Sequence, residues 1–221
     1  MIKAYSKYLL VLLVFLLSGC VSSVGTSKVS SKKSRIIFEV PASVNSEKVS
    51  ESLFEAVNLR VNDLQTNENF LPEQLPAQPE GPKSSGSAIS SQLQGLAAMA
   101  GGSPALEMMN LNTTNAYYTV SGQGGSSSSF NKQEEYYKAA VYPYKDGYKI
   151  YLYLFYKEGT NGIVGALAKS ALASVVGNEG SLLYMAQVRD KFIKFIPEAK
   201  IISQSPSKLN QVVLNGATKG Y

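Results

Sequence analysis

The sequence contains no histidine and a single cysteine, Cys20, among its 221 residues. Without histidine, the chain lacks the side chain that most often serves as a catalytic base near neutral pH and as a metal ligand. It also lacks the motifs that bind phosphate, dinucleotides and calcium. Ser–Lys or paired-carboxylate chemistry is compatible with the composition, but no spacing indicates either. We therefore expect no catalytic residue, no cofactor and no metal site.

Strong charge of one sign is also missing. The formal net charge is +5, and no block of like charge is long enough to indicate nucleic-acid binding. A loose basic cluster follows the amino-terminal segment, at Lys28, Lys32, Lys33 and Arg35. It is suited either to contact with anionic lipid headgroups or to a solvated tether.

The amino terminus has the plan of a secretory signal. Lys3 and Lys7 precede an apolar run at residues 9–17, and small residues follow the run. This run is too short to span a membrane comfortably as a helix. The sequence therefore predicts an export signal rather than a transmembrane segment.

The residues Leu17-Ser18-Gly19-Cys20 that end this signal resemble the lipobox of the bacterial lipoproteins. The resemblance implies removal of the signal peptide, residues 1–19, by cleavage between Gly19 and Cys20. It also implies that palmitate or similar acyl chains are attached to Cys20. Each buried CH₂ of such a chain contributes about 0.8 kcal/mol, so two or three chains give a permanent anchor. Because Val21 rather than Asp follows Cys20, the sorting rule of the family implies the outer membrane. We expect the anchored domain to face the periplasm, although the sequence does not specify the leaflet. The alternatives are an ordinary signal peptide with an incidental cysteine and a short membrane anchor.

The chain after the anchor is predicted to form one domain. Residues 20–34 lack periodicity and are expected to be a flexible tether, followed by an ordered domain at 35–205. Arg35–Val40 is β-branched and aromatic, which predicts a strand. Asn45 or Ser46 then caps a predicted helix. Its apolar stripe, at i, i+4 and i+8, consists of Val49, Leu53 and Val57.

Residues 62–132, which we call the insertion, have a different composition. They hold five of the nine prolines and several Gly/Ser runs. A stretch of this length and composition is expected to be partly disordered or to lie on the surface. Two fragments within it are predicted to be ordered, a helix at Ile89–Ala100 and a strand at Ala116–Val120.

The carboxy-terminal half contains a predicted hairpin. Segments 136–144 and 148–157 flank Asp146-Gly147, and Asp-Gly between alternating apolar residues indicates a tight turn. With Asp146-Gly147 as the loop, Tyr142 would face Tyr151. One face of the hairpin is expected to join the core through Ala139, Val141, Pro143, Ile150, Leu152 and Leu154.

The other face of the hairpin, which we call the aromatic face, carries Tyr142, Tyr144, Tyr151, Tyr153 and Phe155. If helices cover only one side of the sheet, this face meets solvent. It would then suit a protein partner or stacking against a glycan. In one alternative the insertion covers it, with a lid formed by Leu106, Met108, Met109 and Leu111. In another, the tyrosines pair across the strands without any ligand.

The remaining segments complete a fold prediction. Residues 162–176 form a small-residue apolar helix, either buried in the core or facing a membrane or partner. A helix at Leu182–Phe195, a strand at Ala199–Ser203 and a polar tail at 206–221 follow. The order is the βαββαβ order of the ferredoxin-like class. We therefore predict an α+β fold with two helices on one face of an antiparallel sheet.

These features together predict a non-catalytic, lipid-anchored module that binds a partner or helps to assemble the envelope. Its expected partners are the membrane, through Cys20, and a protein or a cell-wall component. The alternative is a carrier of a small apolar ligand, held in a pocket beside the sheet. The sequence specifies neither the partner nor the oligomeric state.

Overall fold

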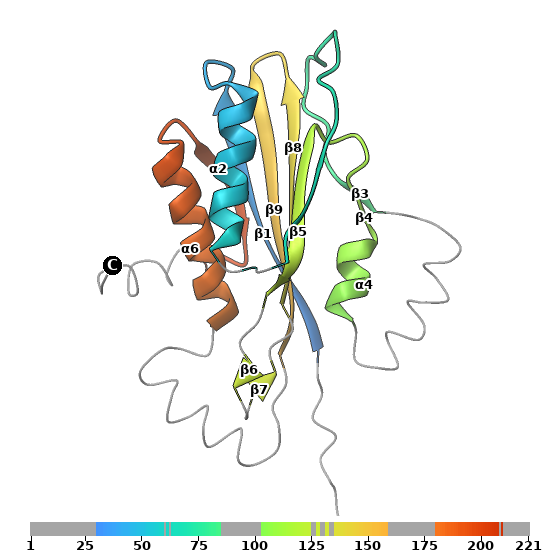
Figure 1. Cartoon of the computed structure of the whole chain (residues 1–221), viewed down its shortest axis with the longest axis vertical. Helices are drawn as coiled ribbons and strands as arrows, with labels where there is room; N and C mark the ends of the chain where they lie inside the picture. Colours follow the sequence, from blue (N-terminus) through green and yellow to red (C-terminus); the bar gives the residue numbers. More distant parts are fainter. Residues whose placement is uncertain are drawn as a thin grey trace, which may run out of the picture.

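The computed structural model has an α+β fold built on a six-stranded antiparallel sheet (Figure 1). The strand order is β10-β1-β9-β8-β5-β2. These strands are β1 (Ser30–Pro41), β2 (Gln65–Glu68), β5 (Tyr118–Gly124), β8 (Glu135–Tyr144), β9 (Gly147–Glu158) and β10 (Lys200–Ser205). The predicted α+β class and antiparallel sheet are therefore confirmed.

The structure describes residues 30–59, 61, 63–84, 103–124, 127–128, 131–132, 135–158, 180–207 and 209. Three predicted features lie outside these ranges: Cys20 with its signal segment, the helix at 89–100 and the helix at 162–176. Most of the polar tail also lies outside them.

Helix α2 (Ser46–Asn58) begins where the sequence predicts. The side chain of Asn45 accepts a hydrogen bond from the backbone N–H of Lys48 at 2.7 Å, which satisfies one of the free N–H groups of the first turn. The predicted stripe of Val49, Leu53 and Val57 is fully buried. The predicted cap and the predicted apolar stripe of this helix are therefore both confirmed.

Two further helices are present in the described part of the chain. Helix α6 (Gly180–Phe195) confirms the helix predicted at Leu182–Phe195 and starts slightly earlier, whereas α4 (Pro104–Met109) is a short helix within the insertion. The strand predicted at Ala199–Ser203 is β10.

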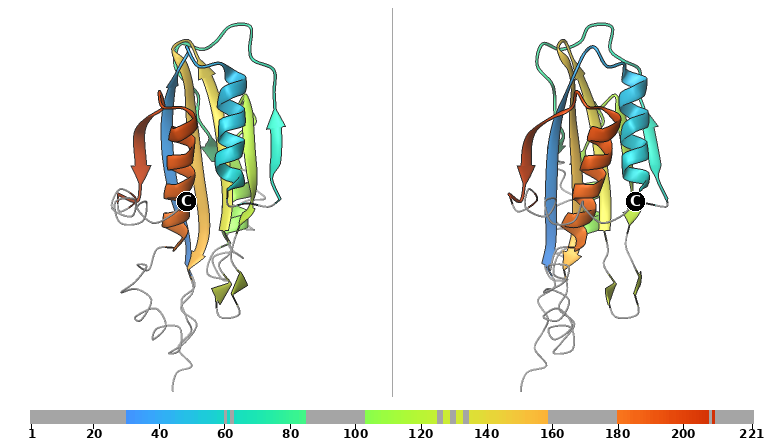
Figure 2. Two further views of the ribbon diagram at one scale, coloured as in Figure 1. Left: turned by 60° about the vertical axis from the view of Figure 1, so that its left-hand side comes forward. Right: turned by 90° about the vertical axis from the view of Figure 1, so that its left-hand side faces the viewer.

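The core is one large cluster that joins α2 and α6 to the sheet. Phe38 of β1 and Phe192 of α6 meet at its centre, with ring centroids 5.0 Å apart. Figure 2 shows α2 and α6 running alongside the strands. All residues of the predicted core face of the hairpin except Pro143 belong to this cluster.

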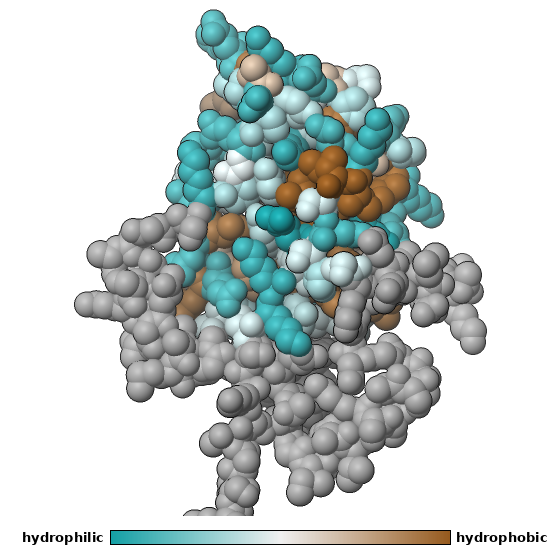
Figure 3. All heavy atoms as spheres, turned by 180° about the vertical axis from the view of Figure 1, so that it is seen from behind, coloured by the Kyte–Doolittle hydropathy of each residue, from teal (hydrophilic) through white to brown (hydrophobic). Residues whose placement is uncertain are grey.

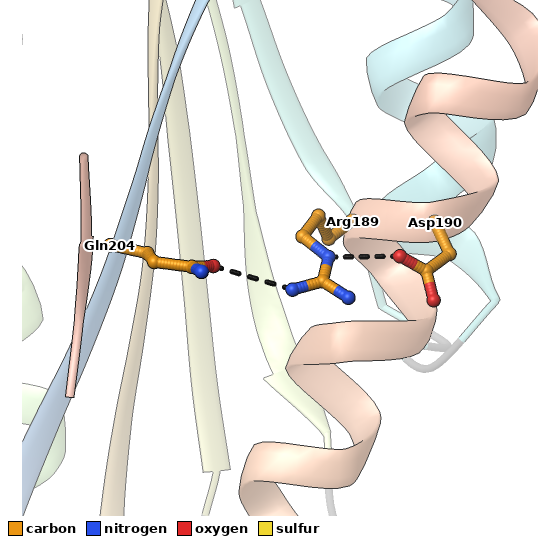
Figure 4. A network of polar contacts seen from close by, with 3 residues as sticks. All are labelled: Arg189, Asp190 and Gln204. Atoms are coloured by element: carbon orange, nitrogen blue, oxygen red, sulfur yellow. Dashed lines mark hydrogen bonds and ion pairs between the residues drawn. The ribbon is translucent and has the colours of Figure 1, made fainter. Parts of the chain in front are cut away.

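A buried arginine links α6 to the edge strand β10 (Figure 4). Arg189 is only 5% exposed. Its Nε donates to Asp190 Oδ1 at 2.8 Å, and an Nη donates to Gln204 Oε1 at 3.3 Å. Since a buried charge is costly without partners, these contacts favour one position of β10 relative to α6.

Strand β1 begins at Ser30, inside the segment predicted to be a tether. Residues 30–34 pair with Glu158–Leu154 of β9, so the ladder continues well beyond the apolar stretch at Arg35–Val40. Hydrogen bonds to the long strand β9 extend β1 here. The local sequence of residues 30–34 does not reveal this partner strand, so the prediction missed the extension.

The insertion is more ordered than its composition indicates. It supplies β2 and β5 to the main sheet, and the predicted strand at Ala116–Val120 is replaced by Tyr118–Gly124. It also forms α4 and two short strand pairs. These pairs are β3 (Lys83–Ser84) with β4 (Leu111–Asn112), and β6 (Ser127–Ser128) with β7 (Asn131–Lys132).

The hairpin is confirmed, but its predicted register is wrong. Gly147 pairs with Tyr144, so Lys145 and Asp146 form the turn, and Tyr142 faces Lys149 instead of Tyr151. Because the register moves by two residues, every side chain keeps its predicted face. Gly147, which was predicted to lie in the turn, is the first residue of β9 and packs against β1. Its φ is +146°, a conformation that glycine adopts without strain.

Candidate functional site

The aromatic face is buried, so the prediction of an open aromatic surface is wrong. The exposed fractions are 2% for Tyr142, 6% for Tyr144, 4% for Tyr153 and 1% for Phe155. Tyr151 is half-buried. The structure therefore has the alternative arrangement, in which the insertion covers this face.

The cover is provided by α4, β4 and the segment around Gly81. Met108 and Leu111, two of the four predicted lid residues, pack with Tyr153 and Phe155. Met109, another of the four, is 71% exposed instead, and Leu106 is half-buried.

Lys138 of β8 fastens this cover to the sheet. Its ammonium group donates to the carbonyl oxygens of Leu111 at 2.8 Å and Met108 at 3.5 Å. Burial lowers the pKa of Lys138 below its ordinary value. The two carbonyl acceptors supply hydrogen bonds that a partly buried ammonium group needs.

The rings under the cover contact one another in sequence. Tyr142 meets Tyr151 edge to face, with centroids 5.6 Å apart, and Tyr151 stacks on Tyr153 at 6.4 Å. Tyr153 stacks in turn on Phe155 at 6.0 Å. Lys33 of β1 lies over Tyr153, 4.8 Å from the centroid. Aromatic pairs of this kind stabilise a sheet without any ligand.

Tyr144 makes a separate contact near the hairpin turn. Its hydroxyl donates to Glu39 Oε1 at 2.5 Å. Burial, followed by this hydrogen bond, raises the pKa of Tyr144 to about 12. The contact links the end of β8 to β1.

A cleft of about 460 Å³ lies at one end of the aromatic face. Its walls are formed by residues from segments 69–80 and 114–117 and by Tyr142 and Pro143 of β8. Figure 1 shows the segment after β2 beside the turn end of the β8–β9 hairpin. Of the predicted site residues, the structure brings only Tyr142 to the wall of this cleft.

Hydrogen bonds hold the walls of the cleft in place. Asn69 makes two hydrogen bonds to the wall formed by segment 114–117. Its Nδ2 donates to Ala116 O and its backbone N–H donates to Tyr117 O, both at 2.7 Å. The backbone N–H of Lys145 donates to Pro76 O at 3.0 Å. Segments distant in the sequence are thus fixed around one opening.

Two polar side chains on opposite walls also meet. Asn115 Nδ2 donates to Glu80 Oε2 at 2.9 Å, and both residues line the cleft. A carboxylate has about four acceptor positions, and an amide has two donors and an acceptor. One hydrogen bond leaves most of this capacity for a ligand.

The hydroxyl of Tyr142 is buried and has no hydrogen-bond partner among the described residues. Burial raises its pKa above the ordinary value, and the neighbouring Tyr153, Tyr151 and Glu80 raise it further. An unpartnered buried hydroxyl costs about 1–3 kcal/mol. Tyr142 lines the cleft, but its hydroxyl is shielded from solvent and therefore does not open into it.

Phe70 lies on the lining of the cleft and is fully exposed. The next residue, Leu71, is 43% exposed. Sequence reasoning missed this site, although a signal was present. Phe70 is the single aromatic residue in the polar, proline-rich stretch 65–84.

A second surface with apolar side chains occurs at the edge strand β10. Ile201 and Ile202 are 37% and 46% exposed there. The register with β1 shifts between Ile37 and Phe38, and an irregular edge of this kind resists pairing with another strand. Figure 3, seen from behind, shows one large group of hydrophobic atoms and several smaller ones among hydrophilic atoms.

The described ranges contain neither a metal-binding cluster nor a membrane-spanning helix. No group of three or more acidic residues there is placed to hold a metal ion. No helix in the same ranges has the length and apolar character needed to cross a membrane. The chain matches no known protein family and no curated protein.

Proposed function

We propose that this chain is a non-catalytic binding module of the bacterial envelope, anchored by lipid to the outer membrane and facing the periplasm. Residues 1–19 are removed and Cys20 carries the acyl chains. The support for the anchor is the lipobox-like sequence Leu17–Cys20 behind a signal-like apolar run. The partner is a protein or a cell-wall component.

The observation that supports a binding function is the composition of the cleft. It combines a fully exposed aromatic ring, Phe70, with the polar side chains of Asn69, Asn115 and Glu80. The exposed ring keeps apolar surface in contact with water, and a ligand that packs on it removes that surface from water. Concave sites with a few convergent polar groups are typical of ligand binding.

Tethering makes such a site useful even when its intrinsic affinity is low. A membrane anchor confines the module to a thin layer beside the bilayer, which raises the effective concentration of any partner in the same layer. The module can therefore act on an envelope structure without a large interface.

The fold we infer for this module is a ferredoxin-like unit with an extended sheet. Without the insertion, the order β1-α2-β8-β9-α6-β10 is βαββαβ. In support, these four strands are neighbours in the order β10-β1-β9-β8, and both helices contribute to the same buried cluster. The insertion adds β5 and β2 at one edge and forms two walls of the cleft.

The alternative, a carrier of a small apolar ligand, needs an apolar cavity. The cleft instead presents side-chain amides and a carboxylate, which an apolar ligand leaves unpaired. No feature of the described residues favours the carrier.

The experiment that tests the proposal has two parts. Cys20→Ser is expected to move the protein from the membrane fraction to the soluble fraction and to remove the acyl mass from the purified chain. The second part compares capture of envelope material by the wild type, Phe70→Ala and Phe195→Ala. Phe195 is an exposed phenylalanine on α6 that does not line the cleft.

We expect Phe70→Ala to lose captured material and Phe195→Ala to retain it. Equal capture by all three proteins contradicts the assignment of the cleft. A membrane-bound and acylated Cys20→Ser protein contradicts the anchor. Substituting the buried tyrosines of the aromatic face is a poorer test, because it would remove packing from under the cover.

A further inference from the structure

We propose that the ligand of the cleft is a glycan built from neutral sugar units, an inference that rests on the proposed binding function. The site would take one or two sugar rings through hydrogen bonds to its amide and carboxylate side chains and through stacking on Phe70. The inference follows from the donor and acceptor capacity of the lining, its charge and its exposed ring.

The polar lining matches groups that both donate and accept hydrogen bonds. Asn69, Gln74 and Asn115 contribute amides, and Glu80 contributes a carboxylate. The amide nitrogens of Asn69 and Asn115 each make one intramolecular hydrogen bond, at 2.7 Å and 2.9 Å, out of the two that an NH₂ group can donate. Adjacent sugar hydroxyls can donate to a carboxylate and accept from an amide at the same time.

Tyr142 contributes to the wall without contributing a donor. Its hydroxyl has no partner among the described residues and is shielded from solvent, so a ligand in the cleft does not reach it. The hydrogen bonds to the ligand are therefore made by the amides and the carboxylate of the lining.

Phe70 supplies the apolar contact that sugars use. The residue is fully exposed, so both faces of its ring are open to solvent. The C–H face of a sugar ring packs on such an aromatic surface while the hydroxyls at its edge remain available for hydrogen bonds.

The charge of the lining argues against other ligands. Glu80 is the one charged residue among the described residues that line the cleft, so this part of the chain offers no cation there to bind phosphate or a carboxylate. A proline-rich peptide offers mainly carbonyl acceptors, which a carboxylate cannot pair with. Neutral sugars match both the acceptor and the donor groups.

Isothermal titration of the full chain in detergent, with a short uncharged oligomer of N-acetylglucosamine as the probe, tests the inference. We expect binding that persists from low to high salt, because no charge pair is formed. Phe70→Ala is expected to weaken binding about tenfold or more through loss of stacking.

A buried tyrosine outside the cleft separates binding from folding. Tyr137 is buried on the other side of β8, and its hydroxyl donates to Glu135 Oε2 at 3.3 Å. Tyr137→Phe is expected to lower the melting temperature and to leave the affinity for the oligomer unchanged, whereas Phe70→Ala is expected to lower the affinity without lowering the melting temperature.

The outcomes distinguish this inference from the proposed function. If the sugar oligomer does not bind but Phe70-dependent capture of a protein persists, the glycan inference is overturned and the binding module stands. If the oligomer binds equally to wild type and Phe70→Ala, it binds elsewhere and the inference is also overturned. If neither sugar nor envelope material depends on Phe70, both proposals are wrong.

Discussion

Gly81 lies directly against the ring of Tyr151. A Cβ atom at position 81 would be 2.7 Å from the Tyr151 hydroxyl oxygen and 3.0 Å from the ring carbon that carries it. The ring itself is held between Tyr142 and Tyr153. This close approach fastens the proline-rich segment onto the aromatic face next to the cleft.

Gly81→Ala is therefore expected to destabilise the protein by about 1–3 kcal/mol, the usual cost of overpacking. Because the nearest atom is the hydroxyl oxygen, Tyr151→Phe is expected to recover part of this loss when the two substitutions are combined. Urea unfolding of the two single variants and the double variant measures the coupling between the residues. Additive effects of the two substitutions contradict the contact.

The aromatic face illustrates what local sequence can and cannot predict. Alternation assigned each hairpin side chain to the correct face, because the period of a strand is fixed by its backbone. Burial was not predictable in this way. The contacts of Met108 and Leu111 with Tyr153 and Phe155 join residues far apart in the sequence, and composition alone made the insertion resemble a disordered segment.

The cleft was not predicted either, because it too depends on contacts between residues far apart in the sequence. Glu80 and Asn115 are joined by a hydrogen bond although 35 residues separate them, and the wall they form exists only after the insertion folds back. By contrast, α2 was predictable because its cap, Asn45, and its stripe are encoded within a few turns. Local patterns predicted the elements, whereas the site depends on long-range packing.

Gly147 provides a second test of close packing. Its φ is +146°, and an added Cβ would be 2.0 Å from the carbonyl oxygen of Val40. Gly147→Ala is therefore expected to separate β9 from β1 locally and to cost more than about 2 kcal/mol, from both strain and overpacking. Thermal unfolding measures the effect. Lys145→Ala, at an exposed turn position, is the matched control and is expected to change stability by less than about 0.5 kcal/mol.

The cap of α2 predicts a smaller and more specific effect. Asn45 Oδ1 accepts from the Lys48 N–H at 2.7 Å, so Asn45→Ala is expected to cost about 1 kcal/mol. Asn45→Asp keeps the acceptor and adds a negative charge at the helix start, so it is expected to retain or increase stability. Equal losses for Ala and Asp, measured by urea unfolding, contradict the capping role.

The contact between Tyr144 and Glu39 predicts how stability changes in alkaline solution. Burial and the hydrogen bond to Glu39 raise the pKa of Tyr144 to about 12, whereas tyrosine in an unfolded chain has a pKa of about 10. Between these values the unfolded chain has lost the proton and the folded chain retains it. Unfolding therefore releases a proton, and the free energy of unfolding falls as the pH rises from about 10 to about 12.

Tyr144→Phe removes this titrating group, so its stability is expected to fall less steeply over the same pH window. Below about pH 10 the variant is expected to be less stable than the wild type, because the hydrogen bond to the Glu39 carboxylate is lost at a cost of about 1–3 kcal/mol. Tyr118, whose pKa is also raised to about 12, chiefly by burial, remains in the variant and preserves part of the slope. Urea unfolding at several pH values across the window measures both slopes. Parallel curves for wild type and variant would show that the Tyr144 proton is held no more tightly in the folded protein than in the unfolded chain.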